Sequence, residues 1–114
     1  MKLAIVGTRT FCDYGKMEDT LEEYKDRITE IISGGAQGAD RLAEIYAKDY
    51  EIPIRIFKAD WKTYGKRAGP MRNKQIVDAA DEVITFWDGK SSGTKSTIDF
   101  AQEKGIPTHI ILIS

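Results

Sequence analysis

The chain has 114 residues, of which 41% are hydrophobic and 31% are charged. That length suffices for one domain with a single core, and the composition is typical of a folded globular protein rather than a disordered one. Lysine and arginine number 17 against 18 acidic residues, for a formal net charge of −1, which argues against a surface that attracts polyanions over its whole extent. We therefore expect residues 1–114 to form one domain.

Cysteine usage and hydropathy indicate the compartment. Cys12 is the single cysteine, so no disulfide can form within the chain and a reducing compartment is expected. No apolar run approaches the roughly 20 residues that a membrane span needs, and the apolar stretch after Met1 is too short for a signal peptide. These features predict a cytoplasmic protein. Because His109 is the single histidine, no zinc-ligand spacing exists and no metal site is expected.

Short apolar segments alternate with segments of helical spacing. The apolar segments are rich in Ile and Val, as buried parallel strands are. They alternate with helical patterns, and alternation of this kind favours parallel strands joined by crossover helices. The sequence predicts a Rossmann-like three-layer α/β/α fold around a central parallel sheet of about five strands in the order 3-2-1-4-5. The predicted strands span 2–7, 28–33, 52–57, 82–87 and 108–113, and the predicted helical patterns span 17–28, 42–50, 69–80 and 94–101.

The loops after the first four strands are expected to converge. In an open parallel sheet, ligands bind beyond the carboxyl ends of the strands. The segments that reach this edge are 7–14, 33–40, 58–73 and 87–96. Any binding site is therefore predicted to draw on all four segments.

The segment SGGAQGAD at 33–40 is nearly devoid of side chains. Glycine lets the backbone approach a ligand closely, and a loop that opens a helix presents unpaired N–H groups to an anion. The segment follows a predicted strand and precedes a predicted helix, so it favours a phosphate site, although a tight turn without a ligand has the same pattern. Gly93 and Thr94 repeat the arrangement after the fourth strand, where ordinary helix capping is the alternative.

Positive charge is concentrated in one part of the chain. Residues 55–74 carry a net charge of +6, which leaves −7 for the remainder and indicates a local anion site. Arg9 and Arg72 are the best candidates for phosphate contacts, because guanidinium groups pair with phosphate bidentately, although either one is equally compatible with a plain surface position. Asp40, in the first turn of its helix, is expected to cap, to orient an arginine or to accept a ribose hydroxyl.

Aromatic residues also fall near the predicted edge. They are Tyr14, Trp61, Tyr64 and Trp87. One or two of these side chains could stack on a base, while packing in the core is the commoner role for residues such as Trp61 and Trp87.

Four segments together resemble a known group of proteins. GTRTFCDY, SGGAQGADRLA, ADWKTYGKRAGPMRN and VITFWDGKSSGT resemble, in order and spacing, the YspA and YpsA-related branch of the SLOG superfamily. The resemblance covers roughly residues 3 to 107. That superfamily is Rossmann-like and also holds the Lonely Guy phosphoribohydrolases and the DNA processing protein A family. Members of this branch are generally proposed to sense or process nucleotide-derived ligands, often in phage or conflict-related settings.

The resemblance implies a pocket at the carboxyl edge that binds or senses a nucleotide or a nucleotide-derived small molecule, with no required cofactor. The glycine loop, the Gly93-Thr94 pair and polar residues of the first and third loops would form it. The predicted ligand-binding residues are Gly7, Thr8, Arg9, Ser33, Gly34, Gly35, Ala36, Gly38, Asp40, Arg72, Asn73, Gly93 and Thr94.

A phosphoribohydrolase-like enzyme is the first alternative. Lonely Guy enzymes carry the pattern P-G-G-x-G-T-x-x-E, and alignment on Gly93-Thr94 places Thr97 where the glutamate belongs. A threonine cannot supply the carboxylate that cleavage of an N-glycosidic bond requires. Asp40, Glu44 and Asp99 are the remaining candidates for that role, and a binding protein without catalysis is favoured.

Single-stranded nucleic-acid binding is the second alternative. The DNA processing relatives share an S-G-x-A-x-G-I-D loop and bind single-stranded DNA. The basic segment 58–74 supports such binding here, whereas the acidic remainder argues against a strong interaction. Apolar outer helix faces, for example at Tyr46 and Tyr50, would permit a homodimer.

Overall fold

The five predicted strands form one parallel sheet. In the computed structural model, which describes residues 1–113, the strand order is β3-β2-β1-β4-β5, so the predicted Rossmann-like topology is confirmed. The strands are β1 (Lys2–Gly7), β2 (Glu30–Ser33), β3 (Ile54–Ile56), β4 (Glu82–Trp87) and β5 (Thr108–Leu112). The helices are α1 (Tyr14–Leu21), α2 (Ala39–Asp49), α3 (Trp61–Tyr64), α4 (Ala68–Ala79) and α5 (Ser92–Lys104), with short 3₁₀ turns at η1 (Lys25–Arg27) and η2 (Gly65–Arg67).

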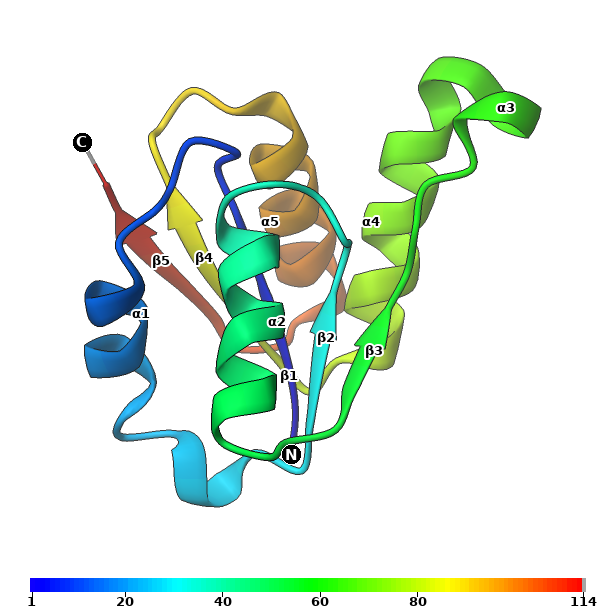
Figure 1. Cartoon of the computed structure of the whole chain (residues 1–114). Coiled ribbons are helices and arrows are strands. Elements are labelled where there is room, and N and C mark those ends of the chain that lie inside the picture. The colour runs from blue at the N-terminus through cyan, green and yellow to red at the C-terminus, as the bar shows by residue number, and fades with distance from the viewer. Residues whose placement is uncertain (114) are drawn as a thin grey trace.

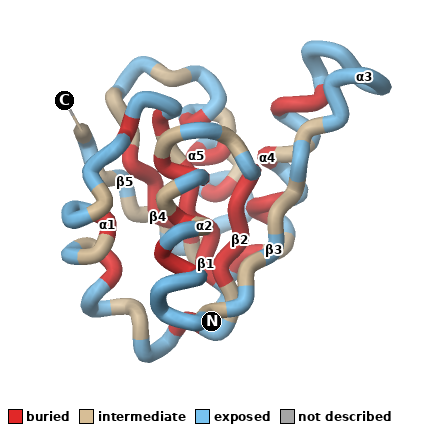
Figure 2. Tube along the Cα trace, in the orientation of Figure 1, coloured by how far each residue is buried: buried red, intermediate tan, exposed pale blue. Residues whose placement is uncertain are grey.

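Two hydrophobic cores lie on opposite faces of the sheet. Successive side chains of a strand point to opposite faces, and β1 shows this: Leu3 and Ile5 pack under α1 and α2, whereas Ala4 and Val6 pack under α4 and α5. All four side chains are buried, which is why β1 reads as a continuous apolar run. Figures 1 and 2 show the buried sheet between its two layers of helices.

The first helical segment is broken, although its spacing predicts one helix from Met17 to Ile28. Helix α1 ends at Leu21, and the chain turns before η1. The turn brings the Tyr24 ring within 5.4 Å of the His109 ring on β5, and the Arg27 guanidinium lies 5.2 Å from the same tyrosine. Tertiary contacts at the edge of the sheet thus override the helical periodicity.

The expected apolar outer face at Tyr46 and Tyr50 is present only in part, because Tyr46 is buried whereas Tyr50 is 38% exposed. Tyr46 is 1% exposed and belongs to the core under α2, and its ring stacks on Tyr50 with centroids 4.3 Å apart. Tyr50 follows the last residue of α2, so its ring stacks on the buried Tyr46 while the residue itself stays exposed. Of this pair, Tyr50 alone could contact a second copy of the chain.

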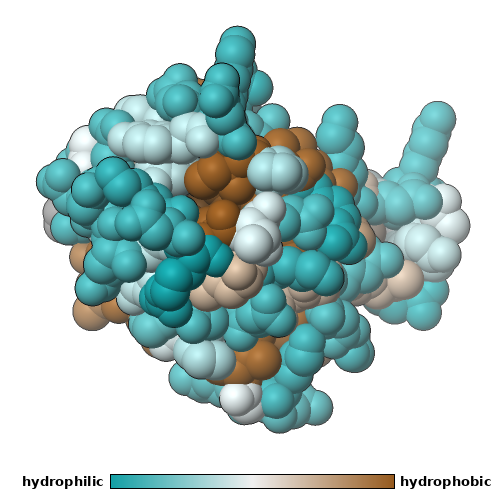
Figure 3. Space-filling model, turned by 90° about the horizontal axis from the view of Figure 1, so that it is seen from below, coloured by the Kyte–Doolittle hydropathy of each residue, from teal (hydrophilic) through white to brown (hydrophobic). Residues whose placement is uncertain are grey.

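The carboxyl ends of the strands meet at one edge, which lies at the top of Figure 1. There, α3 and η2 project beyond the sheet and are exposed along their length (Figure 2). The opposite end, seen from below in Figure 3, is mostly hydrophilic. Within residues 1–113, no helix has the length and hydrophobicity to cross a membrane.

The loops that follow β1, β2, β3 and β4 all lie at the upper edge of the sheet, because the strands are parallel.

Candidate functional site at the carboxyl edge of the sheet

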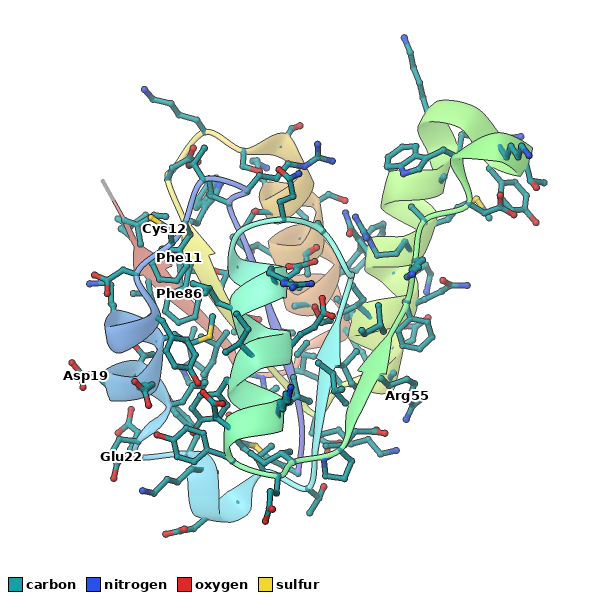
Figure 4. The ribbon with its side chains drawn as sticks, viewed as in Figure 1. Phe11, Cys12, Asp19, Glu22, Arg55 and Phe86 are labelled. Atoms are coloured by element: carbon teal, nitrogen blue, oxygen red, sulfur yellow. The ribbon has the colours of Figure 1, made fainter. Side chains whose placement is uncertain are left out.

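The first loop is fixed to the fourth strand. Thr8 is buried; its backbone N–H donates to the Phe86 carbonyl at 2.9 Å, and its hydroxyl oxygen accepts from the Asp88 N–H at 3.0 Å. Phe11 stacks on Phe86 with ring centroids 4.7 Å apart. Figure 4 labels the two side chains, which lie beside each other. These contacts hold both ends of the loop, so the exposed Arg9 extends from a fixed backbone.

The glycine loop is organised by a carboxylate of its own. Asp40 is buried at the start of α2, and its Oδ2 accepts hydrogen bonds from the N–H groups of Gly34 at 3.1 Å and Ala36 at 3.3 Å. These are two of the donors that a phosphate was expected to meet. Asp40 therefore does not cap α2, whose N-cap Gly38 has no side-chain hydrogen bond; it closes the glycine loop instead, and it leaves an incoming anion to be bound by other groups.

Burial determines the protonation of this carboxylate. It raises the pKa of Asp40 to about 6, against the opposing effects of the Ala36 N–H and of Arg72. Near neutral pH, Asp40 therefore stands close to its titration point.

Gly38 allows the glycine loop to touch the first loop. Its φ is +75°, and a Cβ at this position would overlap the Thr8 carbonyl oxygen and the Arg9 backbone. The Ala39 N–H, one residue later, donates to the same Thr8 carbonyl at 3.3 Å. Glycine is thus required here for contact between loops rather than for contact with a ligand.

Arg72 links α4 to the glycine loop. Its Nη1 donates to the Gly34 carbonyl at 2.6 Å, and its Nε donates to the side-chain oxygen of Asn73 at 3.0 Å. Burial lowers the pKa of Arg72, Asp40 opposes that effect, and Arg9 adds to it. The guanidinium keeps its charge, because the ordinary arginine pKa lies far above neutrality.

The start of α5 is capped from within. The Ser91 hydroxyl oxygen accepts from the Thr94 N–H at 3.4 Å and from the Thr94 hydroxyl at 3.2 Å. The Asn73 amide donates to the Gly93 carbonyl at 3.2 Å and so connects α4 with α5. Ser92 and Gly93 lie in the first turn, where backbone N–H groups have no acceptor inside the helix and face outward.

The loops and α4 enclose two hollows. The first has a volume of about 600 Å³ and lies against the start of α5; we call it the serine pocket. The second has a volume of about 430 Å³ and lies against the glycine loop; we call it the glycine pocket. The serine pocket is lined by Thr8, Arg9, Trp61, Lys66, Gly69, Pro70, Arg72, Asn73, Ser91, Ser92, Gly93 and Ser96, and the glycine pocket by Arg9, Gly34, Gly35, Ala36, Gln37, Lys58, Ala59, Trp61 and Arg72.

A small recess of about 80 Å³ lies between these hollows and the sheet. It reaches Asp40, Thr94 and Thr97. We call the two pockets and this recess together the cleft. Among the described residues, Asp40 is the only carboxylate that lines any part of the cleft, against the cations Arg9, Lys58, Lys66 and Arg72.

The structure brings together most of the predicted ligand-binding residues. All of them line the cleft except Ser33 and Gly38, which shape the glycine loop from behind. Ser33 is fully buried, and its hydroxyl donates to the Asp40 carbonyl at 3.4 Å. Whether the lining residues bind a ligand stays a prediction.

The three candidate catalytic carboxylates are not gathered. Asp40 lines the recess, Glu44 is half-buried one turn further along α2 and lines none of the cleft, and Asp99 is exposed in an ion pair with Lys95 at 2.9 Å. Thr97, at the position of the Lonely Guy glutamate, is buried and donates its hydroxyl to the Gly93 carbonyl at 3.3 Å.

Sequence reasoning missed several lining residues. Lys58, Lys66 and Ser96 were not predicted, although the positive charge of 55–74 signals the two lysines. The short helix α3 was also missed, and packing in the core was the commoner role expected for Trp61, which is in fact 53% exposed. Trp87 is half-buried, and its indole N–H donates to the Ser91 carbonyl at 3.0 Å.

Comparison with known proteins gives one family and one curated relative. The model of the YspA, cpYpsA-related SLOG family matches residues 1–64. The Gene 61 protein of Mycobacterium phage D29 is 33% identical over 115 residues, an alignment that covers 93% of this chain and 92% of the phage protein.

Solved structures of DNA processing protein A share the fold. DNA processing protein A from Streptococcus pneumoniae superposes with a TM-score of 0.82 at 21% identity, over 99% of this chain and 50% of that one. DNA processing protein A from Helicobacter pylori, described with its single-stranded DNA binding mode, superposes with a TM-score of 0.75 at 22% identity, over 100% of this chain and 66% of that one. The chain thus spans one half to about two thirds of these proteins, and at such identities the likeness concerns the fold.

Proposed function

The chain belongs to the YspA, cpYpsA-related SLOG family, and from that premise we propose that its cleft binds single-stranded nucleic acid through the phosphate backbone. The observation that carries this proposal is the charge of the cleft. Four cations line it against one carboxylate, in a chain whose formal net charge is −1. A locally cationic groove beside an exposed aromatic side chain is the usual design of single-strand binding proteins.

The placement of the carboxylate supports binding rather than cleavage. The Oδ2 of Asp40 already accepts hydrogen bonds from two N–H groups of the glycine loop. Glu44 and Asp99 lie outside the cleft. Hydrolysis of an N-glycosidic bond needs a carboxylate that faces the sugar or activates water. The shared fold with DNA processing protein A, whose Helicobacter pylori form binds single-stranded DNA, adds weight to the nucleic-acid ligand.

A nucleotide-derived small molecule is the second candidate, favoured by the recess. Its 80 Å³ are far less than the roughly 300–1,000 Å³ of ordinary ligand sites, so it fits a single phosphate rather than a base. Arg72, Asn73 and Thr94 border it and offer polar hydrogens. A mononucleotide would place its phosphate there and its base in one of the two pockets.

Titration of labelled oligonucleotides tests the proposal. We expect a fluorescein-labelled oligothymidylate of about 12 nucleotides to bind, and a duplex of the same length to bind more weakly. With four cations engaged, the slope of log K against log salt is expected near −3, so raising salt from about 50 to 200 mM weakens binding about 50-fold. The proposal fails if no oligonucleotide binds at low salt. Thermal shifts with nucleoside mono- and diphosphates in place of oligonucleotides would then favour the second candidate.

A further inference from the structure

Trp61 occupies an unusual position for a large apolar side chain. It is 53% exposed at the first position of α3, a turn that Asp60 caps by accepting the Thr63 N–H at 3.1 Å. Tryptophan is highly buried on average, so an indole left half in solvent at the mouth of a cleft needs an explanation.

The indole lies between the serine pocket and the glycine pocket. Among residues 1–113, Trp61, Arg9 and Arg72 alone line both pockets. Under the indole lies Gly69 of α4: a Cβ there would stand 3.1 Å from Cη2 of Trp61, with Cζ3 and Cζ2 the next atoms. These three atoms form the outer edge of the six-membered ring. The indole therefore approaches α4 through this edge, and the side chain borders both pockets.

Each pocket has room for one nucleotide. Their volumes of about 600 and 430 Å³ both fall within the range of ordinary small-ligand sites. Arg9 and Arg72, shared by both pockets, stand where a phosphate that joins two nucleotides would pass. Guanidinium groups suit that phosphate because they donate bidentately.

Resting on the proposed function, we propose that Trp61 inserts between two successive bases of a single strand, with one base in each pocket and the linking phosphate on Arg9 and Arg72. In this arrangement each face of the indole stacks on one base, which a paired and stacked duplex does not allow. The smallest complete ligand is therefore a dinucleotide. Selectivity for single strands follows from this insertion rather than from charge.

Affinity measurements on tryptophan variants test the insertion. We expect Trp61→Ala to weaken oligothymidylate binding by about 30-fold or more, because stacking contributes about 1 to 3 kcal/mol per base and the indole contacts two bases. Trp61→Phe should stay within about fivefold of the wild type. Tyr64→Ala is the matched control, since Tyr64 is also exposed on α3 but lines neither pocket; its affinity should be unchanged. Melting temperatures should show that all three variants are folded, because both side chains are exposed.

The ligand can be varied in the same way. An oligonucleotide with abasic sites keeps its phosphates, so the wild type should bind it about as weakly as Trp61→Ala binds the intact strand. Thymidine dinucleotide should bind with clearly higher affinity than thymidine monophosphate. Quenching of tryptophan fluorescence by the strand should largely disappear in Trp61→Phe, and Gly69→Ala, which displaces the edge of the indole, should weaken binding several-fold.

The outcomes separate this inference from the function beneath it. If the wild type binds oligonucleotides and Trp61→Ala binds them equally well, the insertion is wrong and the nucleic-acid function stands. Equal affinity for intact and abasic strands has the same meaning. If the wild type binds no oligonucleotide at all, the proposed function itself is wrong.

Discussion

Replacing Arg72 by methionine should cost both stability and binding. Methionine keeps most of the length and apolar contact of the side chain but removes the guanidinium. The bond from Nη1 to the buried Gly34 carbonyl and the bond from Nε to Asn73 are then lost. A hydrogen bond from a charged group contributes about 1.5 to 3 kcal/mol, and a buried carbonyl without a partner adds to the cost. We expect the free energy of unfolding to fall by about 2 to 3 kcal/mol.

Thermal denaturation measures this loss directly. For a domain of this size, about 4 °C of melting temperature corresponds to 1 kcal/mol, so Arg72→Met should melt about 8 to 12 °C below the wild type. Arg9→Met is the control for charge in the cleft, because Arg9 is exposed and its substitution should stay within about 0.5 kcal/mol. Both variants should bind oligothymidylate more weakly, and each should reduce the salt slope by about 0.7. If Arg72→Met melts within 2 °C of the wild type, on the order of experimental scatter, Arg72 does not hold the glycine loop.

Three further predictions concern the loops. The affinity for an oligonucleotide without a terminal phosphate should increase as the pH falls through about 6, because Asp40 then loses its negative charge near Arg72 and Arg9. Glu44 is the other charged neighbour of Asp40. The Asp40→Asn variant should lack most of this pH dependence. The folded-state pKa of Asp40 exceeds its unfolded value, so the free energy of unfolding should fall as the pH rises from about 4 through 6, by on the order of 3 kcal/mol, and chemical denaturation of Asp40→Asn should not show this fall. Gly38→Ala should unfold at lower denaturant concentration than the wild type, since the added methyl group meets backbone that cannot move aside.

Much of the fold follows from local patterns. The predicted strands at 2–7 and 82–87 coincide with β1 and β4, because their side chains are buried on both faces and leave a continuous apolar run. At the sheet edges the strands are shorter than predicted, as β3 shows with Ile54–Ile56. The break after Leu21 depends on where β5 lies, and nothing in the local sequence reveals that.

The candidate site was predictable in outline, and its internal contacts were not. Parallel topology alone brings the four loops to one edge, so their convergence needs no side-chain detail. The bonds from Gly34 and Ala36 to Asp40 depend on the side-chain rotamer of that aspartate and on its burial. The exposure of Trp61 depends on the direction in which α3 leaves the sheet (Figure 1), which charge and periodicity do not specify.

The carboxylate inside the glycine loop has a consequence for how a ligand would arrive. If a glycine-rich loop becomes ordered only when a bound anion accepts its hydrogen bonds, the loss of backbone conformational entropy weakens binding. Here Asp40 supplies the acceptor in advance, and Arg72 fixes the Gly34 carbonyl on the other side. The loop is therefore preorganised, and its backbone should superpose in the free and bound proteins. Association would then be limited by diffusion to the cleft and by the ordering of the strand, rather than by any rearrangement of the protein.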